Sequence, residues 1–151
     1  MRLALAALAA VSLAASSALA QPAAGADFLA ANAKADGVQA LPTGVQYKVL
    51  KSGPDTGPHP RIHDVVQVNY EGALLDGTVF DSSAKSGGPR MFQLSTLVPG
   101  WIDALQAMRP GDEWTVWVPP ARGYGAKQVG PIPANSVLVF RLELLAVTPG
   151  S

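Results

Sequence analysis

Runs of alternating hydrophobic and polar residues divide this chain into segments typical of β-strands. In the strongest run, Val66, Val68 and Tyr70 fall on one side, and the polar residues between them fall on the other. A period of two places such side chains on opposite faces, so each run predicts a strand with one buried face. Asp76-Gly77 after this run predicts a two-residue hairpin turn. The predicted strands cover residues 44–51, 65–75, 78–81, 91–94, 113–118 and 136–147.

A different period marks one short helix among these strands. Trp101, Leu105 and Met108 recur at positions i, i+4 and i+7, which places them on one face of a helix over residues 98–108. A lone helix among strands buries its apolar face against the sheet. The pattern therefore predicts an α+β fold, in which a curved antiparallel sheet of about five strands wraps around one short central helix.

The N-terminal residues have the features of a signal peptide over residues 1–20. Arg2 precedes an apolar run over residues 3–13, and Ala18-Leu19-Ala20 has the small-x-small form of a cleavage site. This arrangement predicts export, with cleavage after Ala20. The apolar run is too short to span a membrane. We therefore expect a periplasmic protein without a membrane anchor.

A segment rich in alanine, glycine and proline separates the signal peptide from the predicted domain. Residues 21–43 are interpreted as a linker with a short N-terminal helix over residues 28–36, which Asp27 caps and Gly37 ends. The domain itself is predicted over residues 44–151. Because the helix is short and its apolar residues are mostly alanine, it offers little surface for a dimer contact, so we expect a monomer.

The composition excludes several classes of partner and chemistry. The 151 residues include 11 basic and 11 acidic side chains, and no block of like charge favours nucleic acid as a partner. The absence of cysteine excludes a disulfide framework, a lipid-modified N-terminal cysteine and a cysteine nucleophile. Gly123-Tyr124-Gly125 lacks the following Lys-Ser/Thr of a phosphate-binding loop, so we expect no nucleotide or other cofactor.

Two groups of polar residues suggest other kinds of chemistry. His59 and His63 have a spacing that a metal pair can use, but no third ligand lies nearby in the sequence, so two exposed loop histidines are the favoured interpretation. Ser82 and Ser83 with His63 and an aspartate outline a hydrolytic triad, yet serine and aspartate are common turn residues. A hydrolase is therefore the least favoured hypothesis, and no metal site is expected.

Large apolar side chains are instead frequent at strand ends and in loops near the predicted helix. Tyr124 lies between two glycines in a loop over residues 121–135, and loops of this length are usually functional. Asp81 follows Phe80 directly at the end of an apolar strand, although a turn cap for Ser83 explains it almost equally well. The apolar set comprises Tyr70, Phe80, Phe92, Val98, Trp101, Tyr124, Ile132 and Phe140.

Five motifs follow one another along the predicted domain. They are VNYEG at residues 68–72, DGTVFDSS at 76–83, VPGW at 98–101, YG at 124–125 and IPANSVLVFRLEL at 132–144. Together and in this order, they resemble the FKBP-type peptidyl-prolyl isomerases, and the resemblance extends over residues 44–147. Residues 28–51 also resemble the lead-in of exported bacterial members similar to the macrophage infectivity potentiator.

The resemblance implies an apolar pocket between the sheet and the helix. Trp101 would form its floor, Tyr124 would donate its hydroxyl to a substrate carbonyl, and the Val98 backbone N–H would donate to another carbonyl. Asp81 would be the polar group at the rim, so Asp81 and Tyr124 are the predicted catalytic pair. The substrate-binding walls would come from Tyr70, Phe80, Phe92, Leu97, Val98, Ile132 and Phe140.

A water-poor aromatic pocket suits the isomerisation of X-Pro bonds. Rotation of a planar amide faces a barrier of roughly 18–20 kcal/mol, and the twisted transition state has lost the amide resonance and is less polar. The resemblance therefore implies a peptidyl-prolyl cis-trans isomerase that acts non-covalently on proline-containing unfolded or newly exported polypeptides. The alternative is a chaperone module that binds proline segments with little turnover.

Two departures from the family pattern lie at the rim of the implied pocket. Arg90 stands where some members have phenylalanine, and Pro131 precedes Ile132 where a second aliphatic residue is usual. The family also binds macrolide inhibitors. These two positions are therefore where substrate preference and macrolide affinity are expected to differ.

Overall fold

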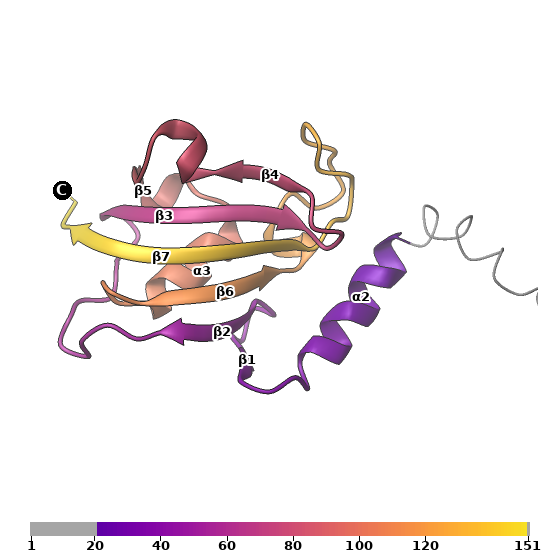
Figure 1. The fold of residues 1–151 in the computed structure, drawn as a ribbon, viewed down its shortest axis with the longest axis horizontal. Coiled ribbons are helices and arrows are strands. Elements are labelled where there is room, and N and C mark those ends of the chain that lie inside the picture. Colours follow the sequence, from indigo (N-terminus) through magenta and orange to yellow (C-terminus); the bar gives the residue numbers. More distant parts are fainter. Residues whose placement is uncertain (1–20, 151) are drawn as a thin grey trace, which may run out of the picture.

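The computed structural model describes residues 21–150, and the signal peptide predicted over residues 1–20 lies outside them. A curved antiparallel sheet has one helix across its inner face and another beside its edge (Figure 1). None of the helices within this range has the length and apolar character needed to cross a bilayer. The elements are α2 (Gln21–Asn32), β1 (Val38–Ala40), β2 (Gln46–Lys51), β3 (Val65–Leu74), β4 (Val79–Ser82), η2 (Ser83–Ser86), β5 (Arg90–Gln93), η3 (Leu94–Thr96), α3 (Pro99–Ala107), β6 (Glu113–Val118), η4 (Pro120–Arg122) and β7 (Leu138–Thr148).

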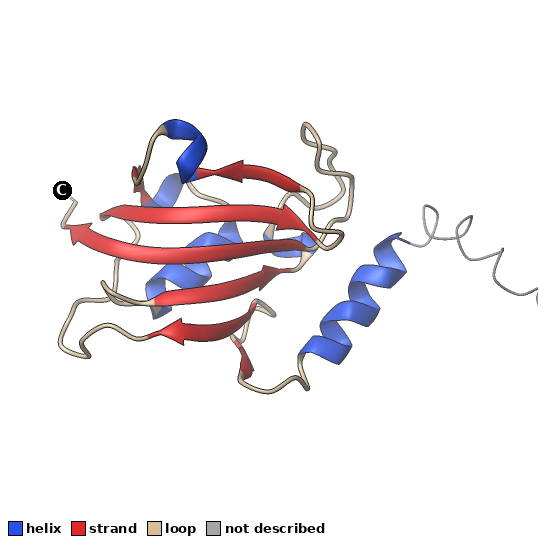
Figure 2. Ribbon diagram, viewed as in Figure 1, coloured by secondary structure: helices blue, strands red, loops and turns tan. Residues whose placement is uncertain are grey.

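The sheet has seven strands in the order β1-β2-β6-β7-β3-β4, and β5 pairs with β3 on the same edge as β4 (Figure 2). Every pairing is antiparallel. The predicted α+β class is therefore confirmed. The sheet has more strands than predicted, in part because β1 lies in the segment interpreted as a linker, where three residues are too few to show an alternation.

The core forms between the inner face of the sheet and α3. Inward-facing residues alternate along β3, β6 and β7 as the sequence pattern predicts. Leu105 and Met108 are fully buried against them. Gly100 is needed for this packing, because a Cβ at that position would lie 2.5 Å from Val118 Cγ1. The helix predicted over residues 98–108 is confirmed with its ends one residue further in.

The N-terminal helix differs from its predicted position. It begins at Gln21 and ends at Asn32, so Asp27 lies in its middle rather than at its cap. The alanine-rich sequence continues the helix upstream of Asp27, where alanine has the highest helix propensity. Its end contacts β2 through Gln46. The alternation of Val45, Gln46 and Tyr47 predicts Gln46 on the polar side of its strand, but its side chain is only 7% exposed. Gln46 Nε2 donates to the Leu29 carbonyl at 2.9 Å, and its Oε1 accepts from Asn32 at 2.8 Å.

Candidate functional site

A pocket of about 220 Å³ opens on the inner side of the sheet, between α3, the edge strands and the loop after β6. Trp101 in the first turn of α3 is 5% exposed and contributes to its lining. The pocket therefore lies beside the N-terminal end of α3 rather than within the closed hydrophobic core. Its lining consists of Tyr70, Phe80, Asp81, Arg90, Phe92, Thr96, Leu97, Val98, Trp101, Tyr124 and Phe140.

Aromatic rings pack edge to face around Trp101. The Trp101 ring lies 5.0 Å from Tyr70 and 5.2 Å from Phe140, at interplanar angles of 77° and 90°. Phe92 meets it at 6.0 Å and 86°. Edge-to-face contacts are the preferred geometry of aromatic pairs, so these contacts restrain the rings as walls. The buried Nε1–H of Trp101 has no hydrogen-bond partner among the described residues.

A glycine on β3 makes room for one of these walls. Gly72 lies opposite Phe140 in the ladder between β3 and β7. A Cβ at Gly72 would lie 2.7 Å from the Phe140 ring and 2.8 Å from the Phe80 ring. The two phenylalanine rings meet over this glycine at 5.8 Å and 89°. The small residue therefore sets how closely Phe80 approaches the sheet.

Tyr70 and Asp81 form a hydrogen-bonded pair in the wall of the pocket. The Tyr70 hydroxyl donates to Asp81 Oδ2 at 2.8 Å, and the Ser82 backbone N–H donates to Asp81 Oδ1 at 2.8 Å. Burial raises the pKa of Tyr70, and the bond to Asp81 raises it further, whereas the positive charge of Arg90 opposes the rise. Tyr70 is therefore held as a neutral donor, and both oxygens of Asp81 have partners within the protein.

Besides the buried Nε1–H of Trp101, two more accessible hydrogen-bond donors at the pocket have no partner in the described part of the chain. The Tyr124 side chain is 36% exposed, and its hydroxyl makes no hydrogen bond there. The Val98 carbonyl accepts from the Trp101 N–H at 3.0 Å at the start of α3, but the Val98 N–H has no acceptor within residues 21–150. Both donors are therefore available to carbonyl groups of a ligand.

The loop that carries Tyr124 is fixed at several points. Arg122 donates to both carboxylate oxygens of Asp103 on α3 at 2.9 Å. The Gly125 N–H donates to the Pro120 carbonyl at 2.9 Å, and the Asn135 N–H donates to the Gly125 carbonyl at 2.7 Å. A bidentate pair of this kind fixes both distance and orientation. Tyr124 is thus presented by an anchored loop, although no regular strand or helix contains it.

Nine of the ten predicted site residues line this one pocket. Ile132 is the exception, because it is 4% exposed and packs in the hydrophobic core. Thr96 also lines the pocket and was not predicted. Threonine at the end of a short 3₁₀-helix has no sequence pattern that marks it as part of a site. The individual roles given to the residues by resemblance stay predictions.

The hydrolytic triad outlined in the sequence does not assemble. Ser83 Oγ accepts the Tyr70 backbone N–H at 3.0 Å, and Ser82 Oγ accepts the Lys85 N–H at 3.3 Å. Within residues 21–150, neither hydroxyl is hydrogen-bonded to a histidine. His59 Nδ1 lies 2.9 Å from the Met108 carbonyl oxygen and therefore anchors its loop to the end of α3. Both serines hold the turn after β4.

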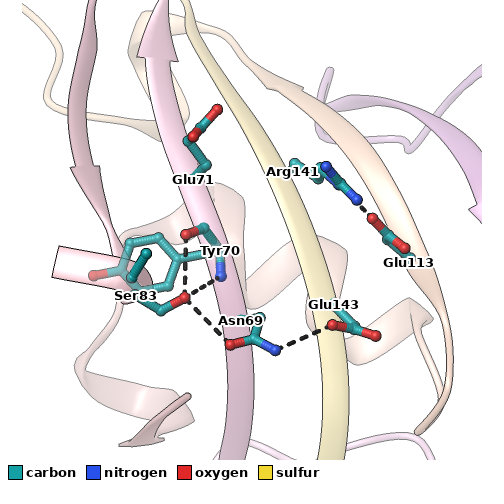
Figure 3. Close-up of a pocket in the computed structure, with 8 residues that line it drawn as sticks. Asn69, Tyr70, Glu71, Ser83, Glu113, Arg141 and Glu143 are labelled. Atoms are coloured by element: carbon teal, nitrogen blue, oxygen red, sulfur yellow. Dashed lines mark hydrogen bonds and ion pairs between the residues drawn. The ribbon is translucent and has the colours of Figure 1, made fainter. Parts of the chain in front are cut away.

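A second hollow, of about 250 Å³, lies on the outer face of the sheet beside β3 (Figure 3). Most of its charged and amide side chains are paired with one another, and Glu71 is the exception among the described residues. Asn69 Nδ2 donates to Glu143 at 3.2 Å, and Arg141 forms an ion pair with Glu113. Its lining consists of Asn69, Tyr70, Glu71, Ser83, Ala84, Glu113, Arg141 and Glu143.

Two family models match the sequence in consecutive segments. The model described as FKBP-type peptidyl-prolyl cis-trans isomerase matches residues 57–145. The model described as the domain amino-terminal to FKBP-type peptidyl-prolyl isomerase matches residues 3–49. The first match contains every residue that lines the inner pocket.

Curated relatives are similar over most of this chain. Outer membrane protein MIP of Legionella longbeachae is 47% identical over 121 residues, which are 80% of this chain and 51% of that protein. The FKBP-type peptidyl-prolyl cis-trans isomerase FkpA of Aeromonas hydrophila is 46% identical over 123 residues, which are 82% of this chain and 45% of that protein. The chain thus spans about half the length of these relatives.

Solved structures show the same fold. The crystal structure of FkpA from Escherichia coli superposes with a TM-score of 0.83 at 38% identity, over 91% of this chain and 63% of that one. A peptidyl-prolyl cis-trans isomerase from Pseudomonas syringae superposes with a TM-score of 0.79 at 35% identity, over 88% of this chain and 96% of that one. With the family-model match and these identities, the chain belongs to the family of FKBP-type peptidyl-prolyl cis-trans isomerases.

Proposed function

We propose that this protein accelerates cis–trans isomerisation of X-Pro bonds in unfolded or newly exported polypeptides. The observation that carries the proposal is the inner pocket, whose aromatic walls surround Trp101 and whose edge holds two unengaged donors, Tyr124 Oη and the Val98 N–H. Relatives over most of the chain are named as isomerases of this kind. Those names favour turnover over the alternative of a chaperone module without it.

The pocket favours the twisted amide over the planar one. A proline ring on Trp101 places the adjoining amide among aromatic side chains, where the planar amide loses the water that solvates its polarised carbonyl. The twisted amide is less polar, so it loses less solvation free energy when water is removed. Each ~1.36 kcal/mol of this preference increases the rate tenfold. No covalent intermediate is needed, because only a rotation about the C–N bond takes place.

The two free donors hold the substrate while the bond rotates. The Tyr124 hydroxyl and the Val98 N–H each donate a hydrogen bond to one substrate carbonyl, which fixes the chain on both sides of the proline. Asp81 has both oxygens occupied by Tyr70 and Ser82, so its role is to orient Tyr70. Of the predicted catalytic pair, we assign Tyr124 as the residue that contacts the substrate and Asp81 as the residue that acts through Tyr70.

An isomerisation assay on a proline peptide tests this function. With a Leu-Pro peptide followed by NMR exchange spectroscopy, the protein should raise the rate far above the uncatalysed exchange, which takes tens to hundreds of seconds. Folded protein that gives no rate above background would falsify the proposal. Suppression of aggregation by the same samples shows whether chaperoning is a separate property.

We also infer export to the periplasm, with the mature chain beginning at Gln21, and a monomeric state. The features of residues 1–20 support export, and one curated relative is named as an outer membrane protein. The short, alanine-rich α2 lies against the domain through Gln46 and supports a monomer. N-terminal sequencing of the periplasmic fraction and light scattering test these two inferences, and a calorimetric titration tests macrolide binding.

A further inference from the structure

Arg90 contributes a positive charge to the wall of the inner pocket. It lies opposite Val68 in the ladder between β5 and β3, and Phe92 lies opposite Val66. Both valines face inward and are fully buried, so Arg90 and Phe92 share the inner side of β5. The Arg90 Cζ atom lies 5.1 Å from the centroid of the Phe92 ring. The guanidinium is therefore stacked on a pocket wall, while Arg90 stays exposed to solvent.

The donors of Arg90 are largely unused. Among the described residues, Nη1 donates to Ser86 Oγ at 3.4 Å, which is a long contact for this donor, and the guanidinium also acts on the Tyr70 hydroxyl, whose pKa it lowers. Within the described chain, the ion pairs are Arg122–Asp103 and Arg141–Glu113, so Arg90 has no carboxylate partner there. A guanidinium carries five N–H donors. Arg90 thus has a charge and several donors that the protein itself does not satisfy.

The other charged group of the pocket lies on the opposite side of Tyr70. Asp81 faces Gly72 in the ladder between β3 and β4, whereas Arg90 faces Val68 in the ladder between β3 and β5. Asp81 already accepts from Tyr70 and Ser82. A negatively charged ligand group that approaches over β5 therefore meets Arg90 before it meets Asp81.

We propose that Arg90 selects substrates with an aspartate or glutamate next to the proline. This inference rests on the proposed isomerase function and narrows its substrate class. A guanidinium matches a carboxylate with two parallel N–H···O bonds. Its contact with Phe92 holds the charge in place before the substrate arrives, which lowers the ordering cost of the new ion pair. The apolar floor binds the proline ring, and Arg90 binds its acidic neighbour.

Matched glutamate and glutamine peptides test this proposal. One pair places Glu or Gln directly before the proline, and the other places Glu or Gln directly after it. At low ionic strength, kcat/KM for the Glu peptide should exceed that for the Gln peptide by about three- to fivefold in one of the two pairs. The ratio should fall toward one in 1 M salt, because salt screens an exposed ion pair.

Three variants assign the ratio to Arg90. Arg90→Gln should bring the Glu/Gln ratio to one or below, and Arg90→Lys should keep part of it, because lysine keeps the charge without the planar fork. Lys85→Gln removes a neighbouring positive charge that does not line the pocket, so it should leave the ratio at the wild-type value. A substitution that lowers activity toward both peptides equally leaves the Glu/Gln ratio of kcat/KM unchanged, so the ratio reports selectivity alone.

Two results would overturn the proposal. One is a Glu/Gln ratio of one for both peptide pairs in the wild-type protein, and the other is a raised ratio that persists in Arg90→Gln. Failure of the proposed function gives a different result, since no peptide would then isomerise faster than background. In that case NMR titration of the same four peptides still gives the affinity ratio, which must depend on Arg90 in the same way.

Discussion

The two faces of strand β3 line hollows of similar size, about 220 Å³ on the inner side and about 250 Å³ on the outer side. On the inner side, aromatic rings surround donors that have no partner in the described chain. On the outer side, Asn69 bonds to Glu143, and Arg141 pairs with Glu113. The volume of a hollow therefore does not identify a binding site here. Unused hydrogen-bonding capacity beside apolar surface does.

Tyr70 belongs to both hollows. Its ring contacts Trp101 on the inner side, and its backbone N–H donates to Ser83 Oγ on the outer side. Ser83 is buried, with 5% of its surface exposed. Its hydrogen bond with the Tyr70 N–H connects η2 to β3 at the position of the Tyr70–Asp81 pair. The outer hollow supports the inner one, although we assign it no ligand.

Replacing Trp101 by alanine should give the greatest loss of activity. Trp101 and Trp114 are both 5% exposed, and each has a buried Nε1–H without a partner among the described residues, so Trp114→Ala is a matched control. Either change should lower the free energy of unfolding by about 3–5 kcal/mol. Only Trp101→Ala should also reduce kcat/KM of the folded fraction, on the order of a hundredfold. Equal activity losses in the two variants would show that the floor has no special role.

Tyr124→Phe should reduce turnover without affecting stability. The hydroxyl has no partner in the described chain, so its removal leaves no protein group unsatisfied. Loss of one hydrogen bond to the substrate corresponds to about a three- to tenfold drop in kcat/KM. Peptide kinetics and urea unfolding measured side by side check this result. An unchanged kcat/KM would remove Tyr124 from the site.

Ser83→Ala should act chiefly on stability. The change leaves the Tyr70 backbone N–H without its acceptor, and a buried unsatisfied donor costs about 1–3 kcal/mol. Ser95→Ala, at an exposed serine on η3, is the control and should unfold like the wild type. Chemical denaturation measures both. Complete loss of activity in stably folded Ser83→Ala would instead revive a direct chemical role for this serine.

Alkaline pH should destabilise the protein through Tyr70. Because its pKa is raised in the folded state, the neutral phenol stabilises the fold at pH values below the unfolded pKa of about 10. This contribution is lost as pH rises through the higher folded pKa. Stability measured against pH should therefore fall more steeply for the wild type than for Tyr70→Phe. Parallel curves above pH 10 would contradict the assignment.

Arg141→Met should change nothing measurable. Arg141 is exposed, and its ion pair with Glu113 lies on the outer face, where such pairs contribute little. Peptide kinetics and the midpoint of urea unfolding should both match the wild type. A fall in activity would show that the outer hollow affects the reaction, and the contrast between the two faces would no longer hold.

Alternation along the sequence predicts most of the fold. Val66, Val68 and Tyr70 face inward, as do the corresponding residues of β6 and β7, because burial of one face requires a period of two. The pattern fails at Gln46, whose polar side chain is buried by α2. A tertiary contact with a helix elsewhere in the chain overrides the local pattern at that position.

The pocket was predictable only in part. Nine of the residues named from motif resemblance line the pocket, whereas Ile132 packs in the core, and the roles given to them stay predictions. The pair between Arg122 and Asp103 joins residues 19 positions apart, and no local periodicity reports it. Arg90 and Phe92 are two residues apart on one strand, so the period of two already places them on one face. Their stacking geometry depends on rotamers that sequence does not reveal.

The long strand β3 is paired along one edge by two short strands, β4 and β5, rather than by a single one. The pocket wall therefore consists of two separately anchored panels, one with Phe80 and Asp81 and the other with Arg90 and Phe92. Gly87 and Gly88 lie in the segment between β4 and β5, and a Cβ added at either position would meet no atom within 4 Å. Substitutions in β5 can therefore change which peptide sequences the pocket binds, while Asp81 is held in place by β4.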